Sequence, residues 1–195
     1  MTEPASATMK PYESPWMDDD LRMLREAVSR FVETEMLPYE AQWRKQKHVD
    51  RETWRKTGEA GFLLMDVPAE YGGGGGDFRH EAVLYEECNR RGLSGFGQGV
   101  HSIAAHYVLN YGTEEQKNRW LPRMASGELI GAIAMTEPGA GSDLKGIRTR
   151  AVRDGDEYVI NGSKIFITNG SIATILMLVV RTDPGDRSRG LSILM

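Results

Sequence analysis

The spacing of apolar residues changes near residue 129, and this change limits what the chain can fold into more than any other feature. In the first part, apolar side chains recur every three to four residues, as between Leu21 and Val32, which is the period of an amphipathic helix. From Ile130 onward, short apolar runs alternate with turn signals such as Asp154-Gly155, which is typical of strands joined by hairpins. The sequence therefore predicts an α+β chain in which helices precede an antiparallel sheet.

We expect a flexible tail over residues 1–15, a helical domain over residues 16–129 and a β domain over residues 130–195. The last segment, Leu191 to Met195, is apolar and carries no polar tail. A strand that ended there would leave an unpaired edge, and chain ends are more often polar and exposed. We therefore interpret the β domain as truncated.

Local signals place the ends of the individual elements. Asp18 to Asp20 favour a helix start, Pro38 is expected to end or kink that helix, and Thr113 with Gln116 forms a capping box. We expect helices at about residues 18–38, 51–61, 77–91, 99–111 and from 114 onward. We expect strands at about residues 130–135, 149–153, 158–160, 164–168, 174–181 and 191–195.

Five consecutive glycines, Gly72 to Gly76, interrupt the helical pattern. Glycine loses more conformational freedom on folding than any other residue, so such a run is too costly inside a helix or a strand. We interpret it as a flexible loop. A phosphate-binding loop is the alternative, but no Lys-Ser or Lys-Thr pair follows to complete a P-loop.

Composition and charge exclude several classes of protein. The formal net charge is −4, and lysine and arginine are scattered, so no nucleic-acid-binding face is expected. The longest apolar run, Ile175 to Val180, is far shorter than a membrane span. Residues 1–16 contain no arginine and no apolar stretch, unlike a signal or transit peptide. The single cysteine fits a reducing compartment, so we expect a cytoplasmic protein.

The cysteine and the histidines do not predict a reactive or metal-binding centre. Cys88 follows Tyr85, Glu86 and Glu87 and has no cationic neighbour in sequence that would favour a thiolate, so we expect a structural role. His101 and His106 are five residues apart, which is the wrong spacing to share one helical face. We expect packing or polar contacts from both, and no metal site.

The most informative segment runs from Thr136 to Asp143. It follows a predicted strand and consists of small residues between two hydroxyl-bearing side chains. Glycines in such a loop let backbone amides approach a ligand closely, which suits the pyrophosphate of a dinucleotide. Leu144 stands where a Rossmann fingerprint has its third glycine. On spacing alone, a plain surface loop is an equally good interpretation.

Four segments of the chain resemble, in order and spacing, motifs of the acyl-CoA dehydrogenase family. The segments are Val67 to Gly73, Gly112 to Glu128, Thr136 to Asp143 and Asn161 to Gly170. The resemblance extends from about residue 18 to the end of the chain. It implies an enzyme that uses FAD to oxidise acyl-CoA thioesters to trans-2-enoyl-CoA. It also implies three domains, namely helices, a small antiparallel β-barrel-like domain and a C-terminal four-helix bundle, of which this chain matches the first and most of the second.

The resemblance also implies which residues bind FAD. They are Ile133, Ala134, Met135, Thr136, Glu137, Pro138, Gly139, Ala140, Gly141, Ser142, Phe166, Ile167 and Thr168. Thr136 is expected at the pyrimidine side of the flavin and Thr168 near its N5 atom, while Ser142 is expected near the pyrophosphate and the acyl-CoA substrate. Many relatives carry tryptophan where Phe166 stands, and phenylalanine at this position resembles the long-chain members.

No catalytic residue is assigned, because the family's base is a glutamate of the C-terminal bundle. Glu137 adjoins the turn of the flavin loop, where we expect a structural or surface role. The chain by itself is therefore expected to be inactive. The alternatives are a non-catalytic remnant or flavin-binding partner subunit, and a fragment of an acyl-CoA oxidase. By resemblance, the expected partners are electron-transfer flavoprotein as acceptor and further copies of the chain in a dimer or tetramer.

Overall fold

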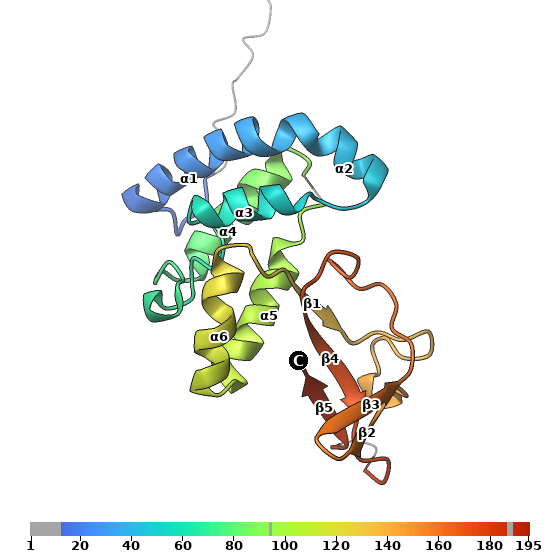
Figure 1. The fold of residues 1–195 in the computed structure, drawn as a ribbon. Coiled ribbons are helices and arrows are strands. Elements are labelled where there is room, and N and C mark those ends of the chain that lie inside the picture. Colours follow the sequence, from blue (N-terminus) through green and yellow to red (C-terminus); the bar gives the residue numbers. More distant parts are fainter. Residues whose placement is uncertain (1–12, 94, 187–188) are drawn as a thin grey trace, which may run out of the picture.

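Helices and strands occupy separate parts of the computed structural model, which describes residues 13–93, 95–186 and 189–195 (Figure 1). The helices are α1 (Asp19–Phe31), α2 (Glu40–Gln46), α3 (Arg51–Glu59), α4 (Phe78–Arg90), α5 (Gln98–Tyr111) and α6 (Glu114–Ala125). The strands are β1 (Gly131–Ala134), β2 (Arg150–Asp154), β3 (Glu157–Asn161), β4 (Ile175–Arg181) and β5 (Leu191–Leu194). The predicted α+β order is confirmed.

Capping residues start the helices where the sequence indicated. The Asp18 side chain accepts from the Leu21 N–H at the start of α1, and Thr113 and Gln116 form the predicted capping box of α6. Pro38 acts as expected. The regular α1 helix ends at Phe31, and the chain passes through a π-helical turn and a 3-10 turn that contains Pro38 before α2 begins.

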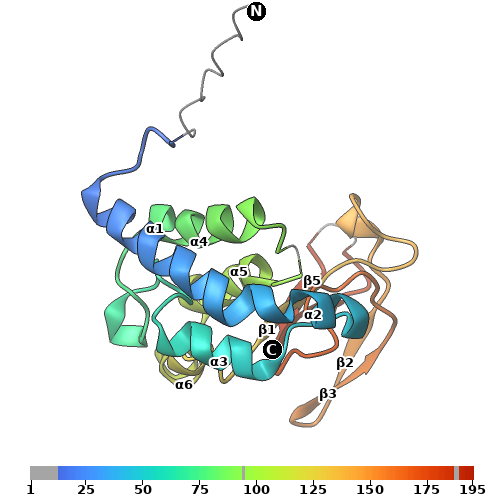
Figure 2. The same ribbon diagram turned by 90° about the horizontal axis from the view of Figure 1, so that it is seen from above.

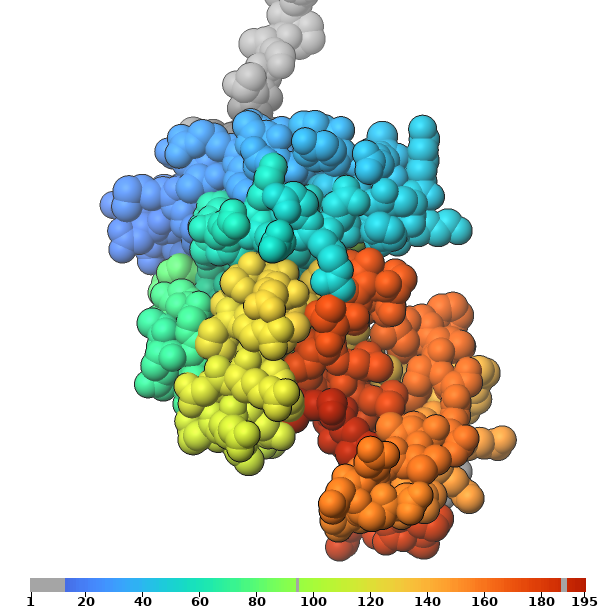
Figure 3. Space-filling model, in the orientation of Figure 1, coloured from blue at the N-terminus to red at the C-terminus, as the bar shows by residue number. Residues whose placement is uncertain are grey.

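Two large apolar clusters organise the described part of the molecule, and a small third one lies around Ala140, Ile147 and Val179. The first lies among the helices, where α1 and α4 run side by side (Figure 2). It includes Trp54 of α3, which is fully buried. The second joins helices to strands, because Val108 of α5 and Leu121 of α6 pack with Met177 of β4. In the space-filling view the surface of α6 touches that of β4 (Figure 3). Burial of this shared cluster places the sheet against the helices.

The sheet is mixed rather than purely antiparallel. β2 pairs with β3 and β4 with β5 in the expected antiparallel sense, whereas β1 and β4 are parallel. The registers pair Gly131 with Ile175, Ala151 with Ile160 and Val179 with Ile193. A hairpin forces its two strands to be antiparallel, but β1 and β4 are joined by a long crossover that carries the β2–β3 hairpin. This connection lets β4 run in the same direction as β1.

The prediction of a strand at residues 164–168 is wrong. The structure has turns rather than a strand between Gly162 and Thr174. Phe166 and Asn169 have φ angles of 56° and 63°, in the left-handed region that breaks the pleat of a strand. The Asn169 carbonyl accepts from the Ala173 N–H in a helix-like turn. The alternating pattern of these residues therefore belongs to a bent segment whose shape is set by its contacts.

The five glycines form the predicted loop, and its backbone is hydrogen-bonded to the segment that precedes it. Each of the N–H groups of Gly72 to Gly76 donates to a backbone carbonyl of the preceding segment. The acceptors belong to Leu64, Met65, Val67, Pro68 and Ala69. All five donors are used within the loop, so the alternative of a phosphate-binding loop finds no support here.

Candidate functional site

The loop that follows β1 presents unused hydrogen-bond donors at the surface. Pro138, Gly139, Gly141 and Ser142 are exposed, and a Cβ added to either glycine would meet no atom within 4 Å. The N–H groups of Gly139, Gly141 and Ser142 donate to none of the residues that the structure describes. Three open amides in a loop with free space suit an acceptor-rich ligand such as a pyrophosphate.

The second predicted segment lies directly beside this loop. The Ile165 N–H donates to the Thr136 carbonyl at 3.0 Å, and Lys164 Nζ donates to the Met135 carbonyl at 2.9 Å. These two bonds join residues 135–142 to residues 164–168. The structure thus brings together the two segments that the sequence assigned to one site.

Phe166 and Thr168 are displayed on the solvent side of the second segment. The Phe166 side chain is 89% exposed. Its φ angle is 56°, in the left-handed region, where a bulky residue is an outlier. Strained backbone at a bulky residue is a reason to look for a function. Within the described part of the chain, the hydroxyls of Thr168, Thr136 and Ser142 have no hydrogen-bond partner. The site therefore offers an aromatic face and three free hydroxyls.

Other predicted site residues lie beneath the loop. Ala134 and Ala140 are buried, and Ile133 packs against the second apolar cluster. A cavity of about 250 Å³ opens next to Thr168, and its walls are residues 47–49, Gly95 and residues 167–172. The exposed and free groups of the site are thus gathered at residues 136–142 and 166–168.

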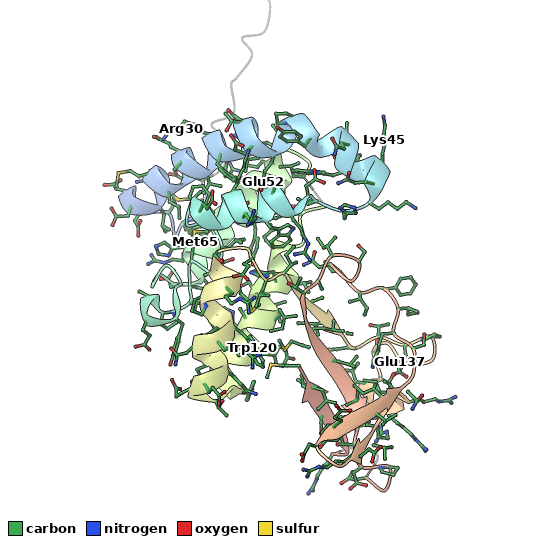
Figure 4. The ribbon with its side chains drawn as sticks, in the orientation of Figure 1. Arg30, Lys45, Glu52, Met65, Trp120 and Glu137 are labelled. Atoms are coloured by element: carbon green, nitrogen blue, oxygen red, sulfur yellow. The ribbon has the colours of Figure 1, made fainter. Side chains whose placement is uncertain are left out.

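Glu137 has a structural rather than a surface role. Its side chain is 6% exposed and lies within the β part of the molecule (Figure 4). One oxygen accepts from the Thr149 N–H and Lys164 Nζ, both at 2.9 Å, and from the Thr149 hydroxyl. The other accepts from the Arg148 N–H at 2.7 Å. Burial raises the pKa of this carboxyl, but these hydrogen bonds outweigh burial and lower the pKa from 4.5 to about 2.

Two further side chains tie the site to the helices. Asn169 Nδ2 donates to the carbonyls of Gly97 and Gly131, both at 3.0 Å. His101 Nδ1 accepts from the Gly131 N–H at 3.0 Å, and its Nε2 donates to the Met124 carbonyl at 3.1 Å. Burial lowers the pKa of His101 to about 4, so the ring is neutral and this tautomer satisfies both partners. The expected packing and polar role of His101 is confirmed.

The sequence did not identify three residues that hold the site together, namely Thr149, Lys164 and Asn169. Lys164 and Asn169 lie in a segment that carried the family resemblance, but their partners are 27 or more residues away. For Lys164 the signal in the sequence was a lysine directly before the apolar run Ile165 to Ile167. Nothing local marks Thr149 as a partner of Glu137.

The remaining candidates stay outside the site. Cys88 is buried, and burial raises the pKa of its thiol to about 12, as a structural role requires. Across residues 13–93, 95–186 and 189–195 there is no group of three histidine, cysteine or acidic side chains that could hold a metal. Nor does any helix of these ranges have the length and apolarity needed to cross a membrane.

Comparison with known families gives matches over most of the chain. The model described as "Acyl-CoA dehydrogenase, N-terminal domain" matches residues 18–128, and that described as "Acyl-CoA dehydrogenase, middle domain" matches residues 132–195. The chain belongs to the acyl-CoA dehydrogenase family. The long-chain specific acyl-CoA dehydrogenase of pig mitochondria (Sus scrofa) is 43% identical over 176 residues, which are 89% of this chain and 41% of the relative.

Solved acyl-CoA dehydrogenases share the fold. The enzyme from Geobacillus kaustophilus is 45% identical with a TM-score of 0.89, and the match covers 93% of this chain and 49% of that one. A glutaryl-CoA dehydrogenase from Mycobacterium smegmatis, solved in complex with FADH2, is 35% identical with a TM-score of 0.79, and the match covers 86% of this chain and 44% of that one. A structure described as an electron transferring flavoprotein of Acidaminococcus fermentans is 34% identical with a TM-score of 0.85, and the match covers 93% of this chain and 48% of that one. The chain spans less than half the length of these members.

Proposed function

We propose that this acyl-CoA dehydrogenase family chain forms the flavin-binding part of an enzyme that oxidises acyl-CoA thioesters to trans-2-enoyl-CoA. One observation carries the proposal. The loop Thr136 to Ser142 and the turn Phe166 to Thr168 lie side by side, with open amides, free hydroxyls and an exposed aromatic ring. These groups match a ligand in which a pyrophosphate is linked to a flat ring, as in FAD, and a solved relative holds FADH2.

Each group has a part in this proposal. The N–H groups of Gly139, Gly141 and Ser142 would bind the pyrophosphate, and the Thr136 hydroxyl would donate to the pyrimidine edge of the flavin, where a donor stabilises negative charge. Phe166 would form an apolar wall against the ring, and the Thr168 hydroxyl would lie near N5. Ser142 would also contact the acyl-CoA. When bound, FAD would supply the hydride acceptor that no side chain can provide. The full flavin site that we propose comprises residues 133–142 and 166–168, with the buried Glu137 holding the loop from beneath.

Glu137 is unsuited to remove the Cα proton of the substrate. Four donors hold its carboxylate, and its pKa is lowered to about 2, whereas an effective general base has a pKa near the working pH. We therefore propose that the base comes from outside these 195 residues and that this chain alone does not turn over. We also propose electron-transfer flavoprotein as the acceptor and a dimer or tetramer as the assembly. The cytoplasmic location stays a prediction.

Titration of the chain with FAD, FMN and NAD⁺, followed by flavin fluorescence and calorimetry, tests the cofactor. FAD is expected to bind more tightly than FMN, because FMN lacks the pyrophosphate that the open amides would bind. Thr168→Ala is expected to weaken FAD binding, whereas Thr34→Ala, a change at an exposed threonine of the π-helical turn, leaves it unchanged. Binding of NAD⁺ in preference to FAD would reject the proposal.

An electron-acceptor dye assay with a series of acyl-CoA thioesters tests the second part. The FAD-loaded chain is expected to reduce the dye no faster than free FAD does. Turnover above that background would show that a base lies within these residues. Glu137→Gln would then reveal whether that base is Glu137.

A further inference from the structure

Three segments without mutual strand pairing meet at one buried ion pair. Lys164 Nζ lies 2.9 Å from Glu137 Oε1, and the two side chains are only 9% and 6% exposed. Glu137 belongs to the loop after β1, and its carboxylate also binds the N–H groups of Arg148 and Thr149, just before β2. Lys164 belongs to the bent segment after β3 and reaches the Met135 carbonyl at 2.9 Å. The pair therefore fastens all three segments to one another.

We propose that the Glu137–Lys164 ion pair positions the two parts of the flavin site. It holds the loop Thr136 to Ser142 at a fixed place beside the turn Phe166 to Thr168. This inference rests on the proposed flavin-binding function. Both residues are positioning residues, because the groups proposed to touch the cofactor are their neighbours along the chain.

The relative position of the loop and the turn depends on hydrogen bonds formed by residues next to the pair. Lys164 binds the carbonyl that precedes Thr136, and Ile165 donates its N–H to the carbonyl of Thr136 itself. Phe166 follows at once, with its ring exposed. Loss of the Lys164 ammonium would remove its bonds to the Met135 carbonyl and to Glu137, and would leave the Ile165–Thr136 backbone bond without support on either side. The Thr136 hydroxyl and the Phe166 ring would then be held less firmly at a fixed separation, and a pre-organised site binds its ligand more tightly than a mobile one.

A buried ion pair is weak evidence for a purely stabilising role. Replacing such a pair by apolar residues is often neutral or stabilising, because desolvation of the charges offsets their attraction. Here each polar atom of the pair also bonds to the backbone. The two Glu137 oxygens accept from the N–H groups of Arg148 and Thr149, and Lys164 Nζ donates to the Met135 carbonyl. Among the described residues, the backbone bonds of the loop Thr136 to Ser142 are the mutual pair of Glu137 and Ala140 and the bond from Ile165 to Thr136. With so few backbone bonds, the loop also needs side-chain contacts to fix its shape.

The test compares Lys164→Met, which removes the charge and keeps the length, with Lys164→Arg, which keeps a cationic donor. Arg123→Met is the matched control, because it removes an exposed ion pair with Glu128. The readouts are the Kd for FAD, hydrogen exchange of the flavin-free chain and the melting temperature. Lys164→Met is expected to raise the Kd about tenfold, the equivalent of one charge-assisted hydrogen bond. Lys164→Arg is expected to restore most of the affinity, and Arg123→Met to leave it unchanged.

Hydrogen exchange separates positioning from general stability. In Lys164→Met, exchange is expected to rise at the amides of Glu137, Ala140 and Ile165, which are hydrogen-bonded in the folded chain, while α5 keeps its protection. An equal rise throughout the chain, or an unchanged Kd, would overturn the proposal. If the Met variant does not fold, Glu137→Gln replaces it, because glutamine keeps an acceptor and removes the charge.

The exchange measurement also distinguishes failure of this inference from failure of the proposed function. A wild-type chain that binds no flavin would reject the flavin-binding function and, with it, the role of the pair in flavin affinity. Local exchange in the variants would still decide whether the pair holds the two segments together.

Discussion

The backbone of Gly73 passes so close to Val67 that a Cβ at Gly73 would lie 2.2 Å from the Val67 carbonyl oxygen. No real Cβ is accommodated at that distance without a shift of the backbone. The Val67 carbonyl is itself engaged by the Gly75 N–H at 2.9 Å. At Gly73, glycine is therefore required by close approach of two backbone segments.

Gly73→Ala is expected to destabilise the protein by about 1–3 kcal/mol, the range for overpacking a site that cannot relax. Urea unfolding followed by circular dichroism measures the change. Gly95→Ala is the control, because a Cβ at Gly95 meets nothing within 4 Å and its φ is not positive. Equal unfolding midpoints for the two variants would contradict this explanation of the glycine run.

Glu137→Gln is expected to change the dependence of stability on acid. The carboxyl pKa is about 2 in the folded chain and 4.5 as a reference, so its stabilisation is present above pH 4.5 and is lost as pH falls through 2. The difference of about 2.5 pKa units corresponds to about 3 kcal/mol. Unfolding free energies of wild type and variant at pH 7, 5 and 3 are expected to converge as the pH falls. A gap that stays constant would show that the carboxylate is not stabilised by its donors.

Glu81→Gln is expected to show the opposite dependence. Burial, and next the charge of Asp66, raise the pKa of Glu81 from 4.5 to about 7. Its stabilisation is therefore present below pH 4.5 and is lost as pH rises through 7. The other polar groups that face it are the Met65 N–H, Tyr85 and His106, and glutamine keeps the acceptor for Met65.

Between pH 4.5 and 8, wild type is expected to lose about 3 kcal/mol relative to Glu81→Gln. Urea unfolding across this range measures the difference. Glu115→Gln, at an exposed carboxylate of α6, is the control for a charge change without burial. Parallel pH profiles of wild type and Glu81→Gln would contradict the raised pKa.

Phe166→Ala is expected to weaken FAD binding without loss of stability. The ring is 89% exposed, so its removal uncovers little apolar surface, and alanine keeps the same backbone strain. Loss of an aromatic contact of about 1 kcal/mol corresponds to about fivefold in Kd. Phe78→Ala is the control, because Phe78 at the start of α4 is 66% exposed. Equal FAD affinities of the two variants would remove Phe166 from the proposed site.

Features that depend on near neighbours in the chain were determined by the sequence. The caps at Asp18 and Thr113 and the stop at Gly112 each act within about four residues, and Pro38 lies in the 3-10 turn that separates α1 from α2. The apolar period then shows which face of each helix is buried. The loop Thr136 to Ser142 was found in the same way, from its small residues and its resemblance to a family motif.

Features that depend on distant partners were decided by the tertiary structure. The segment around Lys164 has the alternation of a strand, but its backbone turns because Lys164 reaches Glu137, 27 residues away, and because Asn169 reaches Gly97 and Gly131. Parallel pairing of β1 with β4 likewise needs a crossover that no local pattern reveals. The same contacts bury Glu137 and lower its pKa, so that of the two roles expected for this carboxylate, structural or surface, the fold selects the structural one. A side chain's neighbours within four residues set its local conformation, but only the partners that folding brings to it set its charge state and its role.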